Sequence, residues 1–251
     1  MILNLGEWTA AQLEAAGRHY EEQGFFLVSG LEKLVVSQFY PLLQAALEGD
    51  GPRWEDVLDP AVPLSPFSRE VRQRLARLTT PPMLAEALLT ELQPVFAKLI
   101  GPLVHVSTTF HAQFKYGAAK AVDHGGYPQD SDYSEVHGAY LLHQDFTGAS
   151  IPTSPSAVTL WVPMNSCPNW NLRLYPGSHR RGLFCQRWIA LDDPRLAPLG
   201  NPVDIAATFG TAVVFNALLL HGTSNPGPAR RVSCDIRFFP LCGFLPSEVR
   251  S

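Results

Sequence analysis

Two histidines, one aspartate and one arginine in the second half of the chain could hold a metal ion beside an anionic cosubstrate. His143 and Asp145 end one apolar run with a single residue between them, and His221 closes a second apolar run. In an extended chain, residues i and i+2 point to the same side, so this imidazole and carboxylate can bind one ion together. Two histidines and one carboxylate leave open positions on an octahedral ion, as oxygen-activating Fe(II) sites require.

Arg231 follows His221 by ten positions and opens the last strand-like run. A guanidinium there can bind the distal carboxylate of a dicarboxylate through two parallel hydrogen bonds, while the 2-oxo acid end chelates iron. An isolated His-x-Asp triplet is a weak signal, because such triplets occur by chance. The triplet followed by a distant histidine and this arginine is far more specific, and it indicates an Fe(II) site with a dicarboxylate cosubstrate.

Other histidines are weaker candidates for ligands. His179 belongs to a Pro-Gly-Ser-His sequence that is typical of a tight turn, so we do not expect it to bind metal. His111 shares one face of an alternating run with Gln113 and Lys115 and is a candidate for lining the site. The remaining histidines of the preceding strand and of the loop that follows it are expected to be ordinary structural or solvated residues: His105, His124 and His137.

The elements that must position these residues change in character near residue 103. Before it, Thr9 and Gln12 form a capping box for a helix that ends near Gly24, and a buried strand follows at residues 25–28. Further helices are predicted at residues 36–47 and 83–100, the latter kinked or split by Pro94, with a proline-rich loop at 49–67 between them.

After residue 103 the pattern has a period of two. Residues 104–115 alternate between apolar and polar side chains, and a polar, glycine-containing stretch at 117–136 has the length of a lid or substrate loop. More strands are predicted at 139–143, 157–162, 172–175, 210–215 and 231–239. Helices followed by many short strands predict a mainly β fold with α-helices, a jelly-roll barrel buttressed by N-terminal helices. We expect one domain over residues 1–251, helical to about 100 and a barrel from about 103 to 240.

Composition excludes several classes of protein. The chain of 251 residues is 46% hydrophobic and 17% charged, as globular proteins are, and its formal net charge of −4 gives no basic surface for nucleic acid or anionic membrane. No apolar run is long enough to span a bilayer, and the first residues lack the features of a signal peptide. Four cysteines without a CxxC pair indicate thiols in a reducing compartment. We therefore expect a cytoplasmic protein whose partner is a small molecule; a homodimer is an open alternative to a monomer.

Several sequence motifs in residues 141–239 resemble the phytanoyl-CoA dioxygenase-like branch of the Fe(II)/2-oxoglutarate oxygenases. The order and spacing of the motifs agree with that family, and the Glu22 to Val28 stretch resembles its usual opening. The matching pieces are Leu-His-Gln-Asp at 142–145, Thr-Leu-Trp-Val-Pro at 159–163, Leu-Arg-Leu-Tyr-Pro-Gly-Ser-His at 172–179, and His-Gly-Thr at 221–223 with Arg231.

The resemblance implies a double-stranded β-helix, a jelly-roll or cupin-like barrel, in which His143, Asp145 and His221 bind Fe(II). It also implies that Arg231 holds the distal carboxylate of 2-oxoglutarate and that Thr223 adds a hydrogen bond. Further residues that it places near the metal or cosubstrate are Gln144 and Trp161, with Gln113 or Lys115 from an earlier strand. The segment between His221 and Arg231 is about one residue shorter than the family's commonest form, which leaves Arg230 and Arg237 as alternative anchors.

The expected activity is that of a non-haem dioxygenase that uses Fe(II), 2-oxoglutarate and O₂. Hydroxylation of a small polar metabolite, either sugar-like or a natural-product intermediate, is the expected reaction, with release of succinate and CO₂. Desaturation, epoxidation and cyclisation use the same ligands and remain alternatives. A cupin-like metalloenzyme without 2-oxoglutarate and an oxygenase acting on a lipid or acyl-CoA are the competing hypotheses.

Overall fold

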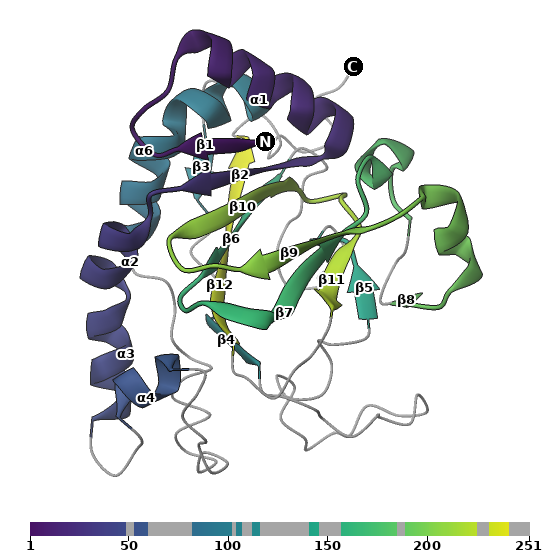
Figure 1. Cartoon of the computed structure of the whole chain (residues 1–251). Helices are drawn as coiled ribbons and strands as arrows, with labels where there is room; N and C mark the ends of the chain where they lie inside the picture. Colours follow the sequence, from purple (N-terminus) through teal and green to yellow (C-terminus); the bar gives the residue numbers. More distant parts are fainter. Residues whose placement is uncertain are drawn as a thin grey trace, which may run out of the picture.

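The computed structural model describes residues 1–48, 53–59, 82–101, 104–106, 112–115, 141–145, 157–184, 189–224 and 231–240. In this part of the chain, N-terminal helices cover one face of a large sheet, and a smaller sheet packs against the other face (Figure 1). The two sheets are antiparallel, except that β1 runs parallel to β2. This mixture of helices and two sheets is the jelly-roll, cupin-like class that the sequence predicts.

The first helix, α1 (Ala10–Gln23), has the predicted capping box. The Gln12 N–H donates to Thr9 Oγ1 at 3.2 Å, and the Thr9 N–H donates to Gln12 Oε1 at 2.9 Å. The helix ends at Gly24, whose φ of 85° lies in the left-handed region, and β2 (Phe25–Ser29) starts at once. These boundaries confirm the prediction for the start of the chain.

Two helix predictions need correction. Instead of one helix at 36–47, the structure has α2 (Glu32–Gln38) and α3 (Tyr40–Leu47). Pro41 has no N–H to donate to the carbonyl of Ser37, so a continuous helix is broken here. The stretch predicted to be loop contains α4 (Trp54–Leu58), with acidic residues in its first turn. The helix α6 (Pro82–Ile100) continues through Pro94 without a split.

Within the described residues, the large sheet has the order β1-β2-β10-β6-β12-β3, and β4 also pairs with β12. The predicted strand at 104–115 appears here as two strands, β3 and β4, which pair with different parts of β12. The bounds of the strands beyond β2 are: β1 (Ile2–Asn4), β10 (Thr211–Asn216), β6 (Val158–Pro163), β12 (Arg231–Pro240), β3 (Val104–Val106) and β4 (Ala112–Lys115).

The small sheet has the order β8-β5-β11-β7-β9 in the described part of the chain. Its strands bring together segments that are far apart in sequence, because β5 and β11 are neighbours although about 80 residues separate them. The sequence did not predict β8, β9 or β11 as strands. Their bounds are β8 (Ile189–Ala190), β5 (Leu141–His143), β11 (His221–Ser224), β7 (Cys167–Leu174) and β9 (Val203–Ala207).

Two apolar clusters hold these layers together. The larger cluster joins the helices to the outer face of the large sheet; Phe96 of α6 packs on Phe238 of β12 with ring centroids 4.4 Å apart. The smaller cluster fills part of the space between the two sheets, where Trp161 and Phe215 meet Leu172 of β7. The cysteines Cys167 and Cys234 are buried in these two clusters, as the sequence predicts for thiols.

The strand β12 presents a different chemistry on each face. Its outward residues are apolar members of the larger cluster: Val232, Cys234, Ile236 and Phe238. By the alternation of a strand, the face toward the small sheet carries polar and charged residues: Arg231, Ser233, Asp235 and Arg237. One strand therefore ties the helical layer to the interior between the sheets, where the candidate site lies.

No helix in the described part of the chain combines the length and the apolar character that crossing a membrane would need.

Gly24 offers a test of how α1 is fixed to the sheets. A Cβ at this position would lie 2.5 Å from His179 Nδ1 and 2.7 Å from Leu219 Cδ1, in addition to the strain of a positive φ. We predict that Gly24→Ala lowers the free energy of unfolding by about 2–4 kcal/mol, because strain and overpacking add. Chemical denaturation measures the loss.

Gly177 provides the matched control, since its backbone (φ 75°, ψ −4°) is close to that of Gly24 (φ 85°, ψ 4°). The nearest atom to an added Cβ there is the Glu22 carbonyl oxygen at 3.5 Å, an ordinary contact. Gly177→Ala should cost about 1–2 kcal/mol from strain alone. Equal losses for the two variants would show that His179 and Leu219 yield to the new methyl group and that the packing is not tight.

Candidate metal centre

His143, Asp145 and His221 come together at one end of the pair of strands β5 and β11. The two strands are antiparallel, and His143 lies directly opposite His221, with ring centroids 4.2 Å apart. One ligand atom from each of the three residues lies within 4.8 Å of the others. Asp145 Oδ1 is 3.6 Å from Nε2 of His143 and 3.7 Å from Nε2 of His221. Three ligand atoms therefore face one point.

The ring of His221 is oriented by its own strand end. Its Nδ1 lies 2.9 Å from the carbonyl oxygen of Leu219, so the proton is assigned to Nδ1, which donates to that oxygen. This tautomer leaves the lone pair of Nε2 available to a metal ion, on the ring nitrogen that lies 3.7 Å from Asp145 Oδ1. The Phe215 ring, 4.6 Å from the imidazole between centroids, packs against it. The imidazole is thus held in the form and direction that a metal ligand needs.

The carboxylate of Asp145 is buried and has a partner on each oxygen. Thr159 Oγ1 donates to Oδ2 at 2.6 Å, and Arg237 Nη2 donates to Oδ1 at 2.9 Å. Burial would raise the pKa of Asp145, but the charge of Arg237, the two histidines when they are protonated, and the Thr159 hydrogen bond bring it below its usual value. The group is therefore an anion, and its Oδ1 faces both imidazoles.

This donor set fits Fe(II). Two neutral imidazole nitrogens and one carboxylate oxygen form the 2-His-1-carboxylate set, which leaves positions on the metal open to a cosubstrate and O₂. Metal ligands also need hydrogen-bond partners that fix their orientation. Leu219 is such a partner for His221, and Thr159 and Arg237 are such partners for Asp145.

The predicted anchor, Arg231, is buried between the sheets with 2% of its surface exposed. Its Nη2 donates to Thr223 Oγ1 at 3.2 Å, and its Cζ lies 5.3 Å from the centre of the Trp161 ring. Burial lowers the pKa of Arg231 to about 10, against an opposing effect of Asp235, so the guanidinium is still a cation at neutral pH. Arg231, Thr223 and Trp161 are thus brought together, as the sequence analysis expects of neighbours in a site.

The polar groups beside Arg231 are donors that suit a carboxylate. Ser233 shares this face of β12, and its Oγ is fully buried with no hydrogen-bond partner among the described residues. A buried hydroxyl without a hydrogen bond is costly unless a ligand or water accepts its proton, and a carboxylate would accept it. The guanidinium, the Thr223 hydroxyl and the Ser233 hydroxyl therefore form a donor set suited to an anion.

Arg237, an alternative anchor in the sequence analysis, has a different place. It makes the ion pair with Asp145, and Cα of Arg237 is paired with that of Thr159 on β6. Asp235 lies between Arg237 and Arg231 along β12 and is partly buried. Burial raises the pKa of Asp235, and the negative charge of Asp145 raises it further. The other alternative, Arg230, lies outside the described residues.

The amide of Gln144, between the two ligands, is engaged by the backbone. It has no exposed surface, and it makes hydrogen bonds with Gly182, Phe184 and Leu218. Gln113 and Lys115 lie in β4, where their Cα positions pair with Ser233 and Arg231, respectively. Roles for these residues at the cosubstrate stay predictions. His111, His124, His137 and the segment 117–136 lie outside the described residues.

Sequence reasoning did not single out Thr159, Ser233 or Asp235. A signal for two of them was present, because counting by twos from Arg231 places Ser233 and Asp235 on the same face of the strand. Thr159 lies two residues before Trp161, within a motif already noted, yet its contact with Asp145 depends on how the two sheets pack.

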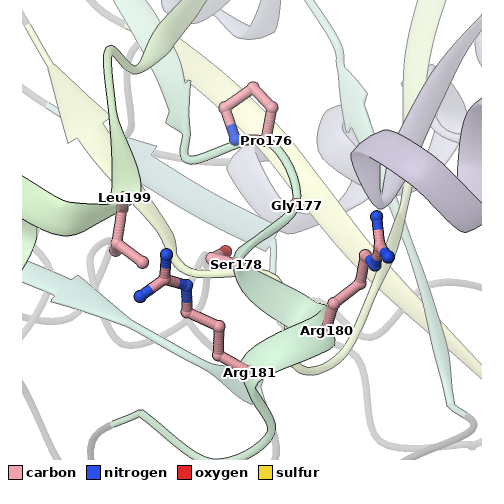
Figure 2. A pocket seen from close by; sticks show the side chains of 6 residues that line it. All are labelled: Pro176, Gly177, Ser178, Arg180, Arg181 and Leu199. Carbon is pink, nitrogen blue, oxygen red and sulfur yellow. The ribbon is translucent and has the colours of Figure 1, made fainter.

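His179 belongs to the predicted turn after β7, in a short 3₁₀ helix (Ser178–Arg181). Its Nε2 lies 3.1 Å from the carbonyl oxygen of Glu21, so it ties this turn to α1 rather than to the metal centre. A pocket of about 410 Å³ borders the same turn and includes none of the three ligands. Figure 2 shows Arg180 and Arg181 directed to different sides of the turn, so they do not converge on one anion.

Comparison with protein families gives one match that covers more than half of the chain. The model of the phytanoyl-CoA dioxygenase family (PhyH) matches residues 66–232, which include the three ligands and Arg231. No curated protein matches the chain.

Solved structures share the fold at low sequence identity. The carbocyclase SnoK from nogalamycin biosynthesis, described as non-heme and alpha ketoglutarate dependent, superposes with a TM-score of 0.58 at 18% identity, over 93% of this chain and 86% of its own. EctD from S. alaskensis, solved with 2-oxoglutarate and 5-hydroxyectoine, gives 0.57 at 20% identity over 96% and 81%. The epimerase SnoN, solved with Fe³⁺, alpha ketoglutarate and nogalamycin RO, gives 0.56 at 15% identity over 92% and 84%.

The three ligands can be tested by metal content. We predict that His221→Ala weakens Fe(II) binding by more than about 100-fold, since loss of a partner that only orients a ligand already costs about 10–100-fold. Anaerobic equilibrium dialysis against Fe(II), with iron quantified in the protein chamber, measures the change. His179→Gln is the control, because it removes another partly buried imidazole without touching the three ligands. Loss of iron in the control, or its retention in His221→Ala, would contradict the assignment.

Proposed function

The chain belongs to the phytanoyl-CoA dioxygenase family, and we propose that it is a non-haem Fe(II)- and 2-oxoglutarate-dependent oxygenase that hydroxylates an unactivated C–H bond of a small polar metabolite. The observation that carries this proposal is the convergence of His143, Asp145 and His221, whose ligand atoms lie within 4.8 Å of one another. Proteins with unrelated ligand sets can share a jelly-roll, so the fold alone would not support the activity.

Iron and 2-oxoglutarate are the cofactors. Bound together, they supply the oxidative chemistry: O₂ is consumed, 2-oxoglutarate is converted to succinate and CO₂, and one oxygen atom enters the substrate. The role of the protein is to hold the three ligands in place. Asp145 carries the negative charge that a divalent cation needs, while Thr159 and Arg237 fix the direction of its two oxygens.

Arg231 is our proposed anchor for the distal carboxylate of 2-oxoglutarate. Its burial matters, because a guanidinium shielded from water binds a carboxylate more strongly than an exposed one does. Thr223 and Ser233 lie where they can add hydrogen bonds, and Trp161 holds the guanidinium from its side. Arg237 is the weaker choice for this role, since its guanidinium is paired with a metal ligand. Gln113 and Lys115 are proposed contributors from β4.

The substrate class follows from the charges near the metal. Arg237 has 22% of its side chain exposed, and Asp235 is partly exposed on the same face of β12. An acyl chain would cover these partly exposed groups and remove their contact with water, whereas a polar metabolite can hydrogen-bond to them. The solved structures of EctD with 5-hydroxyectoine and of SnoN with nogalamycin RO are consistent with small polar or natural-product substrates. A lipid or acyl-CoA substrate is therefore disfavoured.

Hydroxylation is the proposed reaction. SnoK is described as a carbocyclase and SnoN as an epimerase, so this fold also supports outcomes other than hydroxylation. The mass of the product separates them: hydroxylation adds one oxygen atom, ring closure removes two hydrogen atoms, and epimerisation leaves the mass unchanged.

We further propose that residues 1–251 act as one domain, because α6 and β12 share one apolar cluster.

The anchor can be tested before any substrate is known. We predict that Arg231→Gln weakens 2-oxoglutarate binding to the Fe(II)-loaded protein by about 10–100-fold, because a buried charged hydrogen bond contributes about 1.5–3 kcal/mol. The measurement is an anaerobic titration with 2-oxoglutarate, followed through the weak visible charge-transfer band that requires both components. Iron affinity itself should not change.

Arg173→Gln is the matched control, since Arg173 pairs with Asp204 between neighbouring strands of the small sheet. Its backbone lies opposite Gly222, so its side chain is on the other face of the sheet from His221. Its titration should follow that of the wild type. If wild-type protein binds iron but shows no band with 2-oxoglutarate, the cosubstrate is wrong and the cupin-like metalloenzyme becomes the better hypothesis. If Arg237→Gln weakens 2-oxoglutarate binding and Arg231→Gln does not, the anchor has been misassigned.

A further inference from the structure

Gln144 lies between two metal ligands yet faces away from them. It separates His143 from Asp145, and in an extended chain its side chain points to the opposite side. The structure gives it no exposed surface. A glutamine that is completely buried loses its hydrogen bonds to water, so its amide requires replacements within the protein.

Three backbone groups in two chain segments supply these replacements. Gln144 Nε2 donates to the carbonyl oxygens of Gly182 at 2.9 Å and Leu218 at 2.5 Å. Gln144 Oε1 accepts from the N–H of Phe184 at 2.6 Å. The partners are 38, 74 and 40 positions away in sequence, respectively. One amide thus joins the segment carrying His143 and Asp145 to two remote segments.

The bond to Leu218 matters most for the metal centre, because it reaches the turn that delivers His221. In this turn the Leu218 N–H donates to Asn216 Oδ1 at 2.8 Å, and the Leu219 carbonyl accepts the proton of His221 Nδ1 at 2.9 Å. The peptide that Gln144 holds is therefore adjacent to the carbonyl that orients the imidazole. Moving this turn would move the direction of the His221 lone pair.

The bonds to Gly182 and Phe184 brace the same turn from a second side. These residues follow the 3₁₀ helix that starts at Ser178, and Ser178 Oγ accepts the N–H of Leu220 at 2.9 Å. Gln144 and Ser178 thus hold the Leu218–Leu220 turn at two successive points. The two ligand-bearing segments are connected through side chains as well as through the short pairing of β5 with β11.

We propose that Gln144 is a positioning residue of the metal centre: its amide fixes the segment of His143 and Asp145 against the turn that precedes His221 and thereby sets metal affinity and coordination geometry. This inference rests on the proposed function, since it assumes that the three residues bind a metal. An amide suits the role because two donors and one acceptor are needed at one point. Neither a carboxylate nor an apolar side chain provides them.

The test uses the full chain and Co(II), whose visible absorption bands report the geometry of its ligands. In Gln144→Leu, the dissociation constant for Co(II) should rise by about 10–100-fold, the range typical for losing an orienting partner, and the bands should shift. Asn165→Leu is the matched control. Asn165 is another buried amide that joins two segments, through Leu58 O and the Val232 N–H, at 2.9 Å each. It should lose thermal stability but keep the Co(II) affinity and the bands of the wild type.

Gln144→Glu is the second variant, in case Gln144→Leu does not fold. It keeps an acceptor for Phe184 but places a carboxylate against two carbonyl oxygens. An added negative charge would by itself strengthen cation binding, so weaker Co(II) binding in this variant supports positioning. The proposal is overturned if a folded Gln144 variant binds Co(II) as tightly as the wild type with unchanged bands, or if Asn165→Leu shows the same losses. Failure of the wild type to bind Co(II) would instead contradict the proposed function.

Discussion

The register between β5 and β11 is the constraint on which the metal centre depends. His143 stands opposite His221 in this pairing, and Asp145 follows two residues later. A shift of one residue in either strand would turn one imidazole to the opposite face, because side chains alternate along a strand. Among the described residues, two pairs define the register directly, so this strand pairing alone is a short support. Hydrogen bonds made by the flanking residues also fix the position of the two strands relative to each other.

Placing four ionisable groups between two sheets, two of them buried and two partly buried, is expensive, and their arrangement shows how the cost is met. Asp145 and Arg237 form an ion pair, Arg231 lies beside the Trp161 ring, and Asp235 stands between the two arginines along β12. A buried pair contributes little net stability relative to apolar residues of the same size, because desolvation opposes the attraction. The charges are therefore better explained by what the interior must bind than by what holds the fold together. Stability comes from the apolar clusters on either side.

The sequence predicted the parts of this structure that depend on local chemistry. The capping box at Thr9, the end of α1 at Gly24, and the strands that carry His143 and Arg231 follow from residue types and spacing, and the structure confirms them. The break between α2 and α3 was missed, although Pro41 could have indicated it. Strand β11 was missed for a different reason. His-Gly-Thr-Ser has no strand-like pattern, and it pairs because β5 and β7 lie on either side of it. The partners of Gln144 and Asp145 are likewise remote in sequence, so spacing could not reveal them.

Strand β12 has a consequence for attempts to reduce or recombine the protein. Its outward side chains pack against α6, and its inward side chains include both arginines of the site. The two sheets without the helical layer would expose a continuous apolar stripe on the strand that carries those arginines. Such a fragment would tend to associate through this stripe, and nothing would fix the depth at which the arginines sit. The helical layer therefore belongs to the smallest working unit, and transplanting the sheets into another scaffold would require a new surface complementary to Phe238 and its outward neighbours.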